Sequence, residues 1–353
     1  MNSIDYYKSK KFLTKFNEIW DLKCNGYDNL PNKLPAADRI IVLGDIHGDF
    51  DVLLECLQKA GVINSKTEWI GGNTIVVQVG DQIDSCRFDG KNNCSNPKNI
   101  PKFYNQDLPN DIKILKFMTN LHKKAQEKGG AIYSLIGNHE LMNVTGDMSY
   151  VSYSNIISHS STGNVEEGIK NRKELFSPGN EMANFLACTR KIALIIGDNL
   201  FVHAGIVPYI TEKYGLDDIN RILTLFLLKE FDNTDIIKEL LMSSHSPLWT
   251  RVFGKSKLFG KSKQVKDNCD ELMDPLKKIY QVGRIYVGHT PQLETGIQNT
   301  CEEKIWLTDA AMPAAFNKFD DEYKKNGIKN EHRHAQVLEI LTKNGKTTFT
   351  TLK

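Results

Sequence analysis

Residues 40–50 read IIVLGDIHGDF. It begins as a run of apolar and β-branched residues, which is typical of a short buried strand. It then ends in three polar side chains within five residues, Asp45, His47 and Asp49. A strand that only builds a core has no use for these groups at its end. We therefore expect them either to be solvated or to hold a ligand.

The same pattern recurs further along the chain. Apolar runs that end in polar residues are TIVVQVGD at 74–81, AIYSLIGNHE at 131–140, NLFVHAG at 199–205 and RIYVGHT at 284–290. Each run is short, rich in β-branched residues and bounded by glycine. The sequence therefore predicts five buried strands, each followed by chemically active side chains.

Helices are expected between these strands. Phe50, Leu53, Leu54 and Leu57 keep the spacing of one apolar helix face, with Asp49 as the expected N-cap. A second amphipathic pattern covers residues 111–128, and a third covers 216–231. Strands that alternate with helices favour an α/β architecture.

Two turns predict antiparallel strands in the second half of the chain. Asn344-Gly345 lies between alternating runs, which is the strongest short hairpin signal, and Gly197-Asp198 separates two apolar runs. We expect a pair of mixed sheets covered by helices.

Composition limits the classes of partner. The chain has 353 residues, with 45 Lys and Arg against 43 Asp and Glu, so its formal charge is only +2. This balance predicts no nucleic-acid partner and no attraction to a membrane surface. The N-terminus shows no unbroken apolar signal segment, and no later stretch resembles a membrane span.

The seven cysteines are an odd number and show no close CxxC pair. This pattern is more typical of reduced thiols than of a disulfide framework, so we expect a cytoplasmic location. Cys86 and Cys94 bracket one loop and could pair, although free thiols are the preferred interpretation.

The polar residues that follow the strands are expected to meet. In open α/β sheets the loops at the carboxyl ends of strands converge on one crevice. Mixed carboxylate, imidazole and amide ligands suit Mn²⁺, Fe²⁺ or Zn²⁺. The candidate set is large enough for two metal ions: Asp45, His47, Asp81, Asn138, His203 and His289.

The order of these motifs resembles a known family. GDIHG (44–48), GDQID (80–84), GNHE (137–140), VHAG (202–205) and GHT (288–290) resemble the signature of the calcineurin-like metallophosphoesterases, specifically the PPP-type Ser/Thr protein phosphatases. LIGNHELMNVTGDMSYV, PLWTR and VGHTPQ resemble the Shewanella-like phosphatase branch. The resemblance covers residues 39–340 and implies an α/β/β/α sandwich of two mixed sheets flanked by helices.

The resemblance also implies a domain plan. Residues 1–38 are expected to form an N-terminal helical extension, and 39–353 a single metallophosphoesterase catalytic domain. Three stretches without a clear pattern are expected to be loop insertions: 85–111, 151–180 and 254–275.

The family's ligand roles carry over to matching positions. The resemblance implies that Asp45, His47 and His289 hold one metal ion. Asp81 would bridge the two ions, and Asn138 and His203 would complete the second site.

The catalytic roles follow in the same way. His139 would be the general acid that protonates the leaving group, and Asp84 would orient its ring. Arg251 in PLWTR matches a phosphate-binding arginine of the family. Ser85 stands where the family has another arginine, and Arg87 is the candidate replacement.

The resemblance predicts hydrolysis of phosphomonoesters by a metal-bridging hydroxide, with two divalent cations as cofactors. Mn²⁺ is the preferred metal, with Fe or Zn as alternatives. The expected enzyme is a Ser/Thr-type protein phosphatase that could also accept phosphotyrosine, so its partner is a phosphorylated protein or a small phosphoester. Two alternatives stay open: a phosphohydrolase of dinucleoside polyphosphates or other nucleotides, and a phosphate-binding pseudoenzyme or scaffold.

Overall fold

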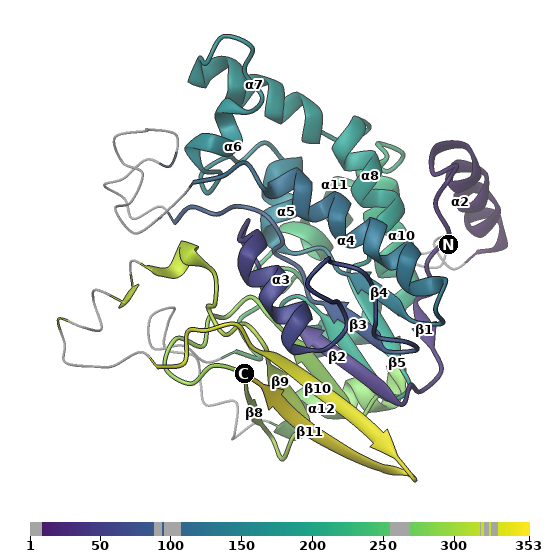
Figure 1. Cartoon of the computed structure of the whole chain (residues 1–353). Helices are drawn as coiled ribbons and strands as arrows, with labels where there is room; N and C mark the ends of the chain where they lie inside the picture. The colour runs from purple at the N-terminus through teal and green to yellow at the C-terminus, as the bar shows by residue number, and fades with distance from the viewer. Residues whose placement is uncertain are drawn as a thin grey trace.

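The frame of the molecule is a pair of mixed β-sheets (Figure 1). A computed structural model describes residues 9–87, 94, 107–254, 269–317, 319–320, 325 and 331–353. One sheet has five strands in the order β11 (Lys346–Leu352), β10 (Val337–Lys343), β2 (Arg39–Leu43), β3 (Ile75–Gln78) and β4 (Ala131–Ser134). The other has six in the order β1 (Lys33–Leu34), β5 (Ala193–Ile196), β6 (Asn199–Val202), β7 (Arg284–Val287), β9 (Ile305–Leu307) and β8 (Gln298–Thr300).

The five strands expected from apolar runs are all present. β2, β3 and β4 run parallel, with Ile41 opposite Val76 and Val76 opposite Ile132. β6 and β7 run parallel in the other sheet, with Leu200 opposite Ile285. Parallel neighbours end at the same edge of a sheet, so the residues that follow these strands are brought together there.

Both predicted turns are also present. β10 and β11 pair antiparallel around Asn344 and Gly345, whose φ angles are 51° and 75°. Positive φ at both central residues is what a type I′ hairpin turn needs. β5 and β6 form the second antiparallel pair, with Ile196 opposite Asn199.

Helices cover the outer faces of both sheets. α3 (Phe50–Lys59) and α4 (Asp111–Gln126) pack against the five-stranded sheet. The Asp49 carboxylate caps α3 by accepting the Val52 N–H at 3.1 Å, as expected. α8 (Glu181–Thr189) and α10 (Leu216–Leu227) pack against the six-stranded sheet. The α/β/β/α class is therefore confirmed.

Strand β5 shows how the core divides between the two faces. Ala193 and Ile195 belong to the cluster that includes α8 and α10, whereas Leu194 and Ile196 pack toward the five-stranded sheet. This alternation is the period of a strand buried on both sides.

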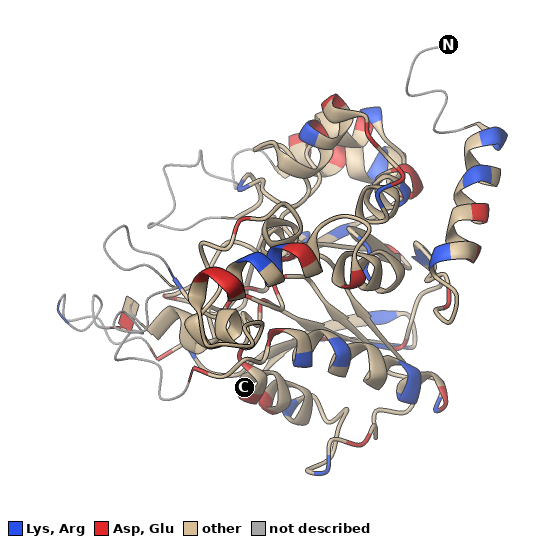
Figure 2. Ribbon diagram, turned by 90° about the horizontal axis from the view of Figure 1, so that it is seen from above, with Lys and Arg blue, Asp and Glu red and all other residues tan. Residues whose placement is uncertain are grey.

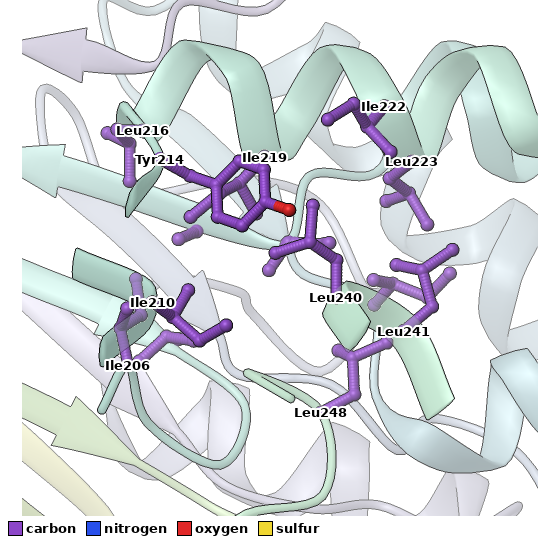
Figure 3. Close-up of a cluster of buried hydrophobic side chains, with 14 of the residues drawn as sticks. Ile206, Ile210, Tyr214, Leu216, Ile219, Ile222, Leu223, Leu240, Leu241 and Leu248 are labelled. Atoms are coloured by element: carbon purple, nitrogen blue, oxygen red, sulfur yellow. The ribbon is translucent and has the colours of Figure 1, made fainter. Parts of the chain in front are cut away.

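The side chains labelled in Figure 3 on the helical side of the core are aliphatic except for Tyr214, which carries a hydroxyl group. There Ile219 and Leu223 of α10 lie near Leu240 of a short π-helical turn (Lys238–Met242) and near Leu248. The remaining helices are α2 (Lys10–Lys23), α5 (Asn138–Val144), α6 (Tyr153–Ile157), α7 (Val165–Phe176), α9 (Pro208–Lys213), α11 (Thr234–Ile237) and α12 (Cys269–Pro275), with short turns at Leu276–Tyr280 and Ala314–Phe316.

The expected insertions differ from the structure in two places. Residues 151–180 contain α6 and α7 rather than an irregular loop. The missed signal is an N-cap: the Asn164 side chain accepts the Glu167 N–H at 2.9 Å, and two acidic residues occupy the first turn. Most of the expected insertion at 85–111 lies outside the described residues, and so does most of the one at 254–275. Helix α12 occupies the end of the 254–275 stretch.

The N-terminal extension packs against the rest of the fold. α2 supplies Phe12, Phe16 and Trp20 to the core, and β1 adds a parallel strand beside β5. Residues 1–8 lie outside the described part of the chain.

The cysteines correct the expectation of reduced thiols. Three disulfides join Cys24 to Cys188, Cys86 to Cys94 and Cys269 to Cys301, and Cys56 is a buried free thiol. Spacing failed to predict them because two of the pairs are separated by 164 and 32 residues. The argument for a cytoplasmic location rested on unpaired thiols and loses that support, so location stays a prediction.

The surface carries both signs of charge. Figure 2 shows basic and acidic residues interspersed along the outer helices, with several lysines on α2. In the described part of the chain, no helix combines the length and the hydropathy that crossing a bilayer requires.

Candidate active site

The ends of five strands bring the predicted residues into one buried cluster. Asp45 and His47 follow β2, Asp81 follows β3, His203 follows β6 and His289 follows β7. Asn138 and His139 open helix α5, directly after β4. All seven side chains are buried. They follow strands of both sheets, so neither sheet could complete the cluster without the other.

Asp81 lies at the centre of the cluster. Its Oδ2 is 3.3 Å from Nε2 of His203, 3.8 Å from Nε2 of His47 and 3.9 Å from Nε2 of His139. All three distances involve the same oxygen of the carboxylate, and Asp81 belongs to both groups of candidate metal ligands. A carboxylate that belongs to both groups is the one that two metal ions would share.

His289 lies on the side of Asp81 that holds His203. Its Nδ1 is 2.8 Å from Asn138 Oδ1, and His203 Nε2 is 2.9 Å from the same oxygen. The expected grouping had His289 share a metal ion with Asp45 and His47, whereas these contacts bring its ring to Asn138 and His203. Only the backbone N–H of His289 contacts Asp45, donating to Oδ2 at 3.1 Å. His47 Nε2 lies 3.8 Å from Oδ2 of Asp45 and 3.8 Å from Oδ2 of Asp81.

Backbone carbonyls fix the orientation of the three imidazole rings. His47 Nδ1 is 3.2 Å from Ile83 O, and His203 Nδ1 is 2.9 Å from Val79 O. His289 uses the opposite nitrogen, with Nε2 at 3.2 Å from Trp249 O. In each ring the other nitrogen faces the cluster, which is the arrangement of metal-ligating histidines.

The backbone is strained at these positions. His47, Asp81, Asp84 and His289 have φ angles of 42°, 54°, 72° and 64°. A positive φ is unfavourable for residues with a Cβ, and such strain is concentrated at functional sites. The tight turns also need glycine: a Cβ at Gly288 would overlap Asp45 Oδ1, because the two chain segments approach so closely.

Burial and like charges act on the carboxylates. Burial raises the pKa of Asp45 well above its usual value, and the charges of Asp309 and Asp81 raise it further. Burial alone would also raise the pKa of Asp81, yet the neighbouring His203 and His139 hold it well below its usual value. Burial, followed by the charge of Arg87, lowers the pKa of His47. Several buried carboxylates this close together need positively charged partners to stabilise their ionised forms.

Asp309 is a site residue that sequence reasoning missed. It follows β9, lines the same pocket and is only 1% exposed. Oδ1 accepts the Ala311 N–H at 2.9 Å, whereas no described group donates to Oδ2. Burial, opposed by the Ala311 hydrogen bond, raises its pKa to about 6. The sequence TDAAMP (308–313) indicates such a residue, because its Asp follows an apolar run just as the predicted ligands do.

His139 is held by a buried polar network. Its Nδ1 lies 2.9 Å from Asp84 Oδ2, as predicted for this pair. Asn143 Nδ2 donates to Asp84 Oδ1 at 2.9 Å, and Arg172 Nε donates to Asn143 Oδ1 at 2.8 Å. Arg172 comes from α7, in a segment that the sequence left unassigned. His139 is therefore oriented by residues from three separate parts of the chain.

Two arginines line the cavity above the cluster, which has a volume of about 460 Å³. Arg251 Nη1 donates to His289 O at 3.1 Å. Arg87 Nη1 donates to Asp84 O at 3.0 Å, and its guanidinium lies 4.5 Å from the centre of the Phe316 ring. Arg87 therefore reaches the site even though Ser85 occupies the position of the family's arginine.

The donor set fits two divalent cations. It combines carboxylate, amide and imidazole ligands, and two groups, one of His47, Asp81 and His139 and one of Asp81, His203 and His289, bring their donor atoms within 4.8 Å of one another. The unpaired Oδ2 of Asp309 in the same pocket adds a further buried acceptor.

Comparison with known proteins identifies the family. The model of the calcineurin-like phosphoesterases matches residues 38–293, which contain every predicted ligand. The chain belongs to the calcineurin-like phosphoesterase family. It is therefore a phosphatase-family hydrolase, and more narrowly a metallophosphoesterase.

Individual proteins are also similar to this chain. An uncharacterised protein of Acanthamoeba polyphaga mimivirus is 34% identical over 248 residues, covering 64% of this chain and 94% of that one. Shewanella-like protein phosphatase 2 of Arabidopsis thaliana is 27% identical over 318 residues, covering 80% of this chain and 73% of that one. The crystal structure of a cold-active protein-tyrosine phosphatase of a psychrophilic Shewanella species matches the metallophosphoesterase fold of this chain with a TM-score of 0.62. It is 22% identical, and the match covers 92% of this chain and 83% of that one.

Proposed function

We propose that this metallophosphoesterase removes phosphate from proteins, using two divalent cations and His139 as the general acid. Mn²⁺ is the proposed metal. The observation that carries the proposal is the contact of His139 with Asp84 at 2.9 Å, beside a carboxylate that both ligand groups share.

The ligand groups define where the cations would bind. Asp45, His47 and Asp81 would hold one ion, and Asp81, Asn138, His203 and His289 the other. When bound, the cations supply positive charge that neutralises phosphoryl oxygens and lowers the pKa of a water molecule.

His139 is positioned to donate a proton to the leaving group. Asp84 accepts from Nδ1 and stabilises the charged ring, which leaves Nε2 as the donor on the side of Asp81. Donation of this proton to the leaving alkoxide is the role of a general acid. Asn143 holds the second oxygen of Asp84, so the carboxylate cannot rotate away from the ring.

The cavity wall supports a phosphorylated side chain as substrate. Arg87 and Arg251 supply positive charge for the phosphate, and Tyr150, Trp249 and Phe316 supply aromatic surface around it. An aromatic wall suits the ring of phosphotyrosine as well as the shorter phosphoserine and phosphothreonine. The tyrosine phosphatase activity named for the Shewanella relative is consistent with this breadth.

The decisive experiment compares substrates and variants. Purified protein with Mn²⁺ should hydrolyse p-nitrophenyl phosphate, and Asp81→Asn should remove that activity. Phosphopeptides carrying each of the three phosphorylated residues should be turned over faster than diadenosine tetraphosphate. Faster turnover of the dinucleotide would replace the proposed substrate with a nucleotide, and metal binding without any turnover would indicate a pseudoenzyme.

A further inference from the structure

Arg87 lines the active-site cavity without a carboxylate partner. Its side chain is partly buried, and it shares the cavity wall with His139 and Arg251. Nη1 donates to the carbonyl oxygens of Asp84 at 3.0 Å and of Cys86 at 2.8 Å. Among the residues that the structure describes, no carboxylate forms an ion pair with Arg87, and no group accepts from its Nε or Nη2. Its charge and these donors therefore stay available to a ligand.

Two aromatic rings hold the guanidinium where a carboxylate could have done so. Its central carbon lies 4.5 Å from the centre of the Phe316 ring and 5.8 Å from the centre of the Tyr150 ring. A guanidinium within about 6 Å of a ring centre is attracted to the negative face of the ring. This attraction leaves the positive charge intact, whereas a carboxylate would neutralise the charge and occupy the N–H donors.

Phe316 is itself fixed in place. It ends the short turn Ala314–Phe316 and is only 2% exposed. The Ala314 N–H donates to Asp49 Oδ2 at 2.9 Å, so the carboxylate that caps α3 also holds the start of this turn. The Phe316 N–H donates to Pro313 O at 3.0 Å. The ring is therefore attached to a well-anchored piece of backbone.

Arg333 anchors the chain just before the turn. Its side chain is 3% exposed; Nε donates to Ala311 O at 2.7 Å, and Nη2 donates to Pro313 O at 2.8 Å. A ring carried by such a segment has little freedom to move. It can therefore limit the positions that are open to the Arg87 guanidinium.

Tyr150 connects Arg87 to the proposed general acid. The N–H of Cys86 donates to Tyr150 O at 3.2 Å, which holds the backbone beside Arg87 against the segment that carries the second ring. The Tyr150 ring also packs edge-to-face against the His139 ring, with centroids 5.0 Å apart. The guanidinium and the imidazole thus share one aromatic neighbour.

We propose that Phe316 is a positioning residue whose ring, together with that of Tyr150, holds Arg87 so that Nε and Nη2 bind the phosphoryl group of the substrate. This inference rests on the proposed phosphatase function. It accounts for phosphate binding in a chain that has Ser85 at the position of the family's arginine. A guanidinium with two N–H donors available matches two phosphoryl oxygens.

The test measures the binding of inorganic phosphate to the full-length, Mn²⁺-loaded protein by isothermal titration calorimetry. Phe316→Leu removes the ring but keeps a bulky apolar side chain, and it should raise the Kd about three- to tenfold. Phe316→Tyr keeps a ring and should stay within about twofold of the wild-type Kd. Arg87→Met removes the phosphate contact and should raise the Kd at least about tenfold.

A double variant separates positioning from a general structural effect. In the Arg87→Met background, Phe316→Leu should leave the Kd unchanged, because the ring then has no guanidinium to hold. Phe349→Leu is the matched control: its ring lies 5.2 Å from the Arg284 guanidinium, neither residue lines the cavity, and the Kd should not change. Tyr150→Leu removes the more distant ring. It should raise the Kd about twofold, and it replaces Phe316→Leu if that variant fails to fold.

Three results would overturn the proposal. One is a wild-type Kd in Phe316→Leu or in Arg87→Met. Another is an equal rise in Kd when Phe316→Leu is made with and without Arg87, which would show that the ring acts on the fold as a whole. The third concerns the metal, because the Phe316 ring lies 5.5 Å from the His47 ring. The Mn²⁺ content of Phe316→Leu should equal that of wild type, and a loss of Mn²⁺ would assign its effect to His47.

Phosphate binding requires no turnover, so the two proposals can fail separately. Wild-type protein that binds phosphate with the expected dependence on Phe316, but never hydrolyses p-nitrophenyl phosphate, would refute the phosphatase function and support the positioning of Arg87.

Discussion

Arg172 Nη2 lies 2.7 Å from Asp111 Oδ2, and both side chains are fully buried. The pair joins α7 to the start of α4, and Asp111 Oδ1 accepts the Asp84 N–H at 3.2 Å. Arg172 also approaches Asp84 Oδ1 at 3.8 Å. One buried guanidinium therefore supports both the helix packing and the carboxylate that holds His139.

Arg172→Met should destabilise the protein by about 3–5 kcal/mol, because it leaves Asp111 as a buried carboxylate without its cation. Urea denaturation measures the loss in the free energy of unfolding. Arg284→Met is the control: its ion pair with Asp198 is partly exposed, with side chains 29% and 58% accessible, so its loss should be below about 1 kcal/mol. Equal losses in both variants would contradict the structural role of Arg172.

His139→Asn should lower kcat for p-nitrophenyl phosphate by about 10²–10⁴-fold, as expected for loss of a general acid. Asp84→Asn should lower it by no more than that amount, because it disturbs the acid without removing it. Metal content, measured by mass spectrometry, should stay at the wild-type value in Asp84→Asn. His245→Asn alters an exposed histidine and should leave kcat unchanged. A wild-type kcat in His139→Asn would exclude the proposed acid.

The proposed grouping of His289 with His203 predicts which metal ion each substitution weakens. His203→Ala and His289→Ala should each weaken the same ion, so the double variant should lose about as much metal as either single one. His47→Ala should weaken the other ion, and its loss should add to that of His203→Ala. Metal stoichiometry after dialysis checks both statements. Additive losses for His203 and His289 would restore the grouping expected from the sequence.

Removal of metal should lower thermal stability, because an ion that binds only the folded state stabilises that state. The expected loss is about 2.7 kcal/mol for each ion present at 100 times its Kd. Differential scanning calorimetry with and without a chelator measures this change. Asp81→Asn should show a much smaller effect of the chelator, and an unchanged Tm in wild-type protein would contradict metal binding.

Lys191→Met should stabilise the protein at pH 7 and lose this advantage in alkaline solution. Burial lowers the pKa of Lys191 from 10.5 to about 8, so the folded state releases its proton before the unfolded state does. The cost of the buried charge is greatest below pH 8 and disappears as the pH rises toward 10.5. The gain at pH 7 is at most about 3 kcal/mol, reduced by loss of the hydrogen bond to Asn29.

The measurement is the free energy of unfolding at pH 7 and at pH 10. Lys66→Met, at an exposed position, should change stability little at either pH. A Lys191→Met gain that is the same at both values would mean that the buried charge is not its cause.

Much of the site was predictable because its residues occupy fixed positions after strands. Each ligand follows a short apolar run, and the order of motifs restricts the family more strongly than any single motif does. Asp45, Asp81 and His203 could therefore be named without coordinates. Asp309 carries the same signal but lies outside the motifs on which the resemblance rests.

Other features depended on contacts between distant segments. Arg172 lies 61 residues from Asp111, and no local pattern indicates that pairing. The disulfide between Cys24 and Cys188 spans 164 residues. The orientation of His289 toward Asn138 is set by the Trp249 carbonyl, which belongs to another loop.

Local sequence patterns were enough to predict the strands, the hairpin and the chemical nature of the site, because periodicity and turn residues act over a few positions. Which histidines lie together, how His139 is held and which cysteines pair depend on the tertiary structure. Those outcomes depend on the packing of two sheets and their helices, which brings side chains within hydrogen-bond distance whatever their separation along the chain.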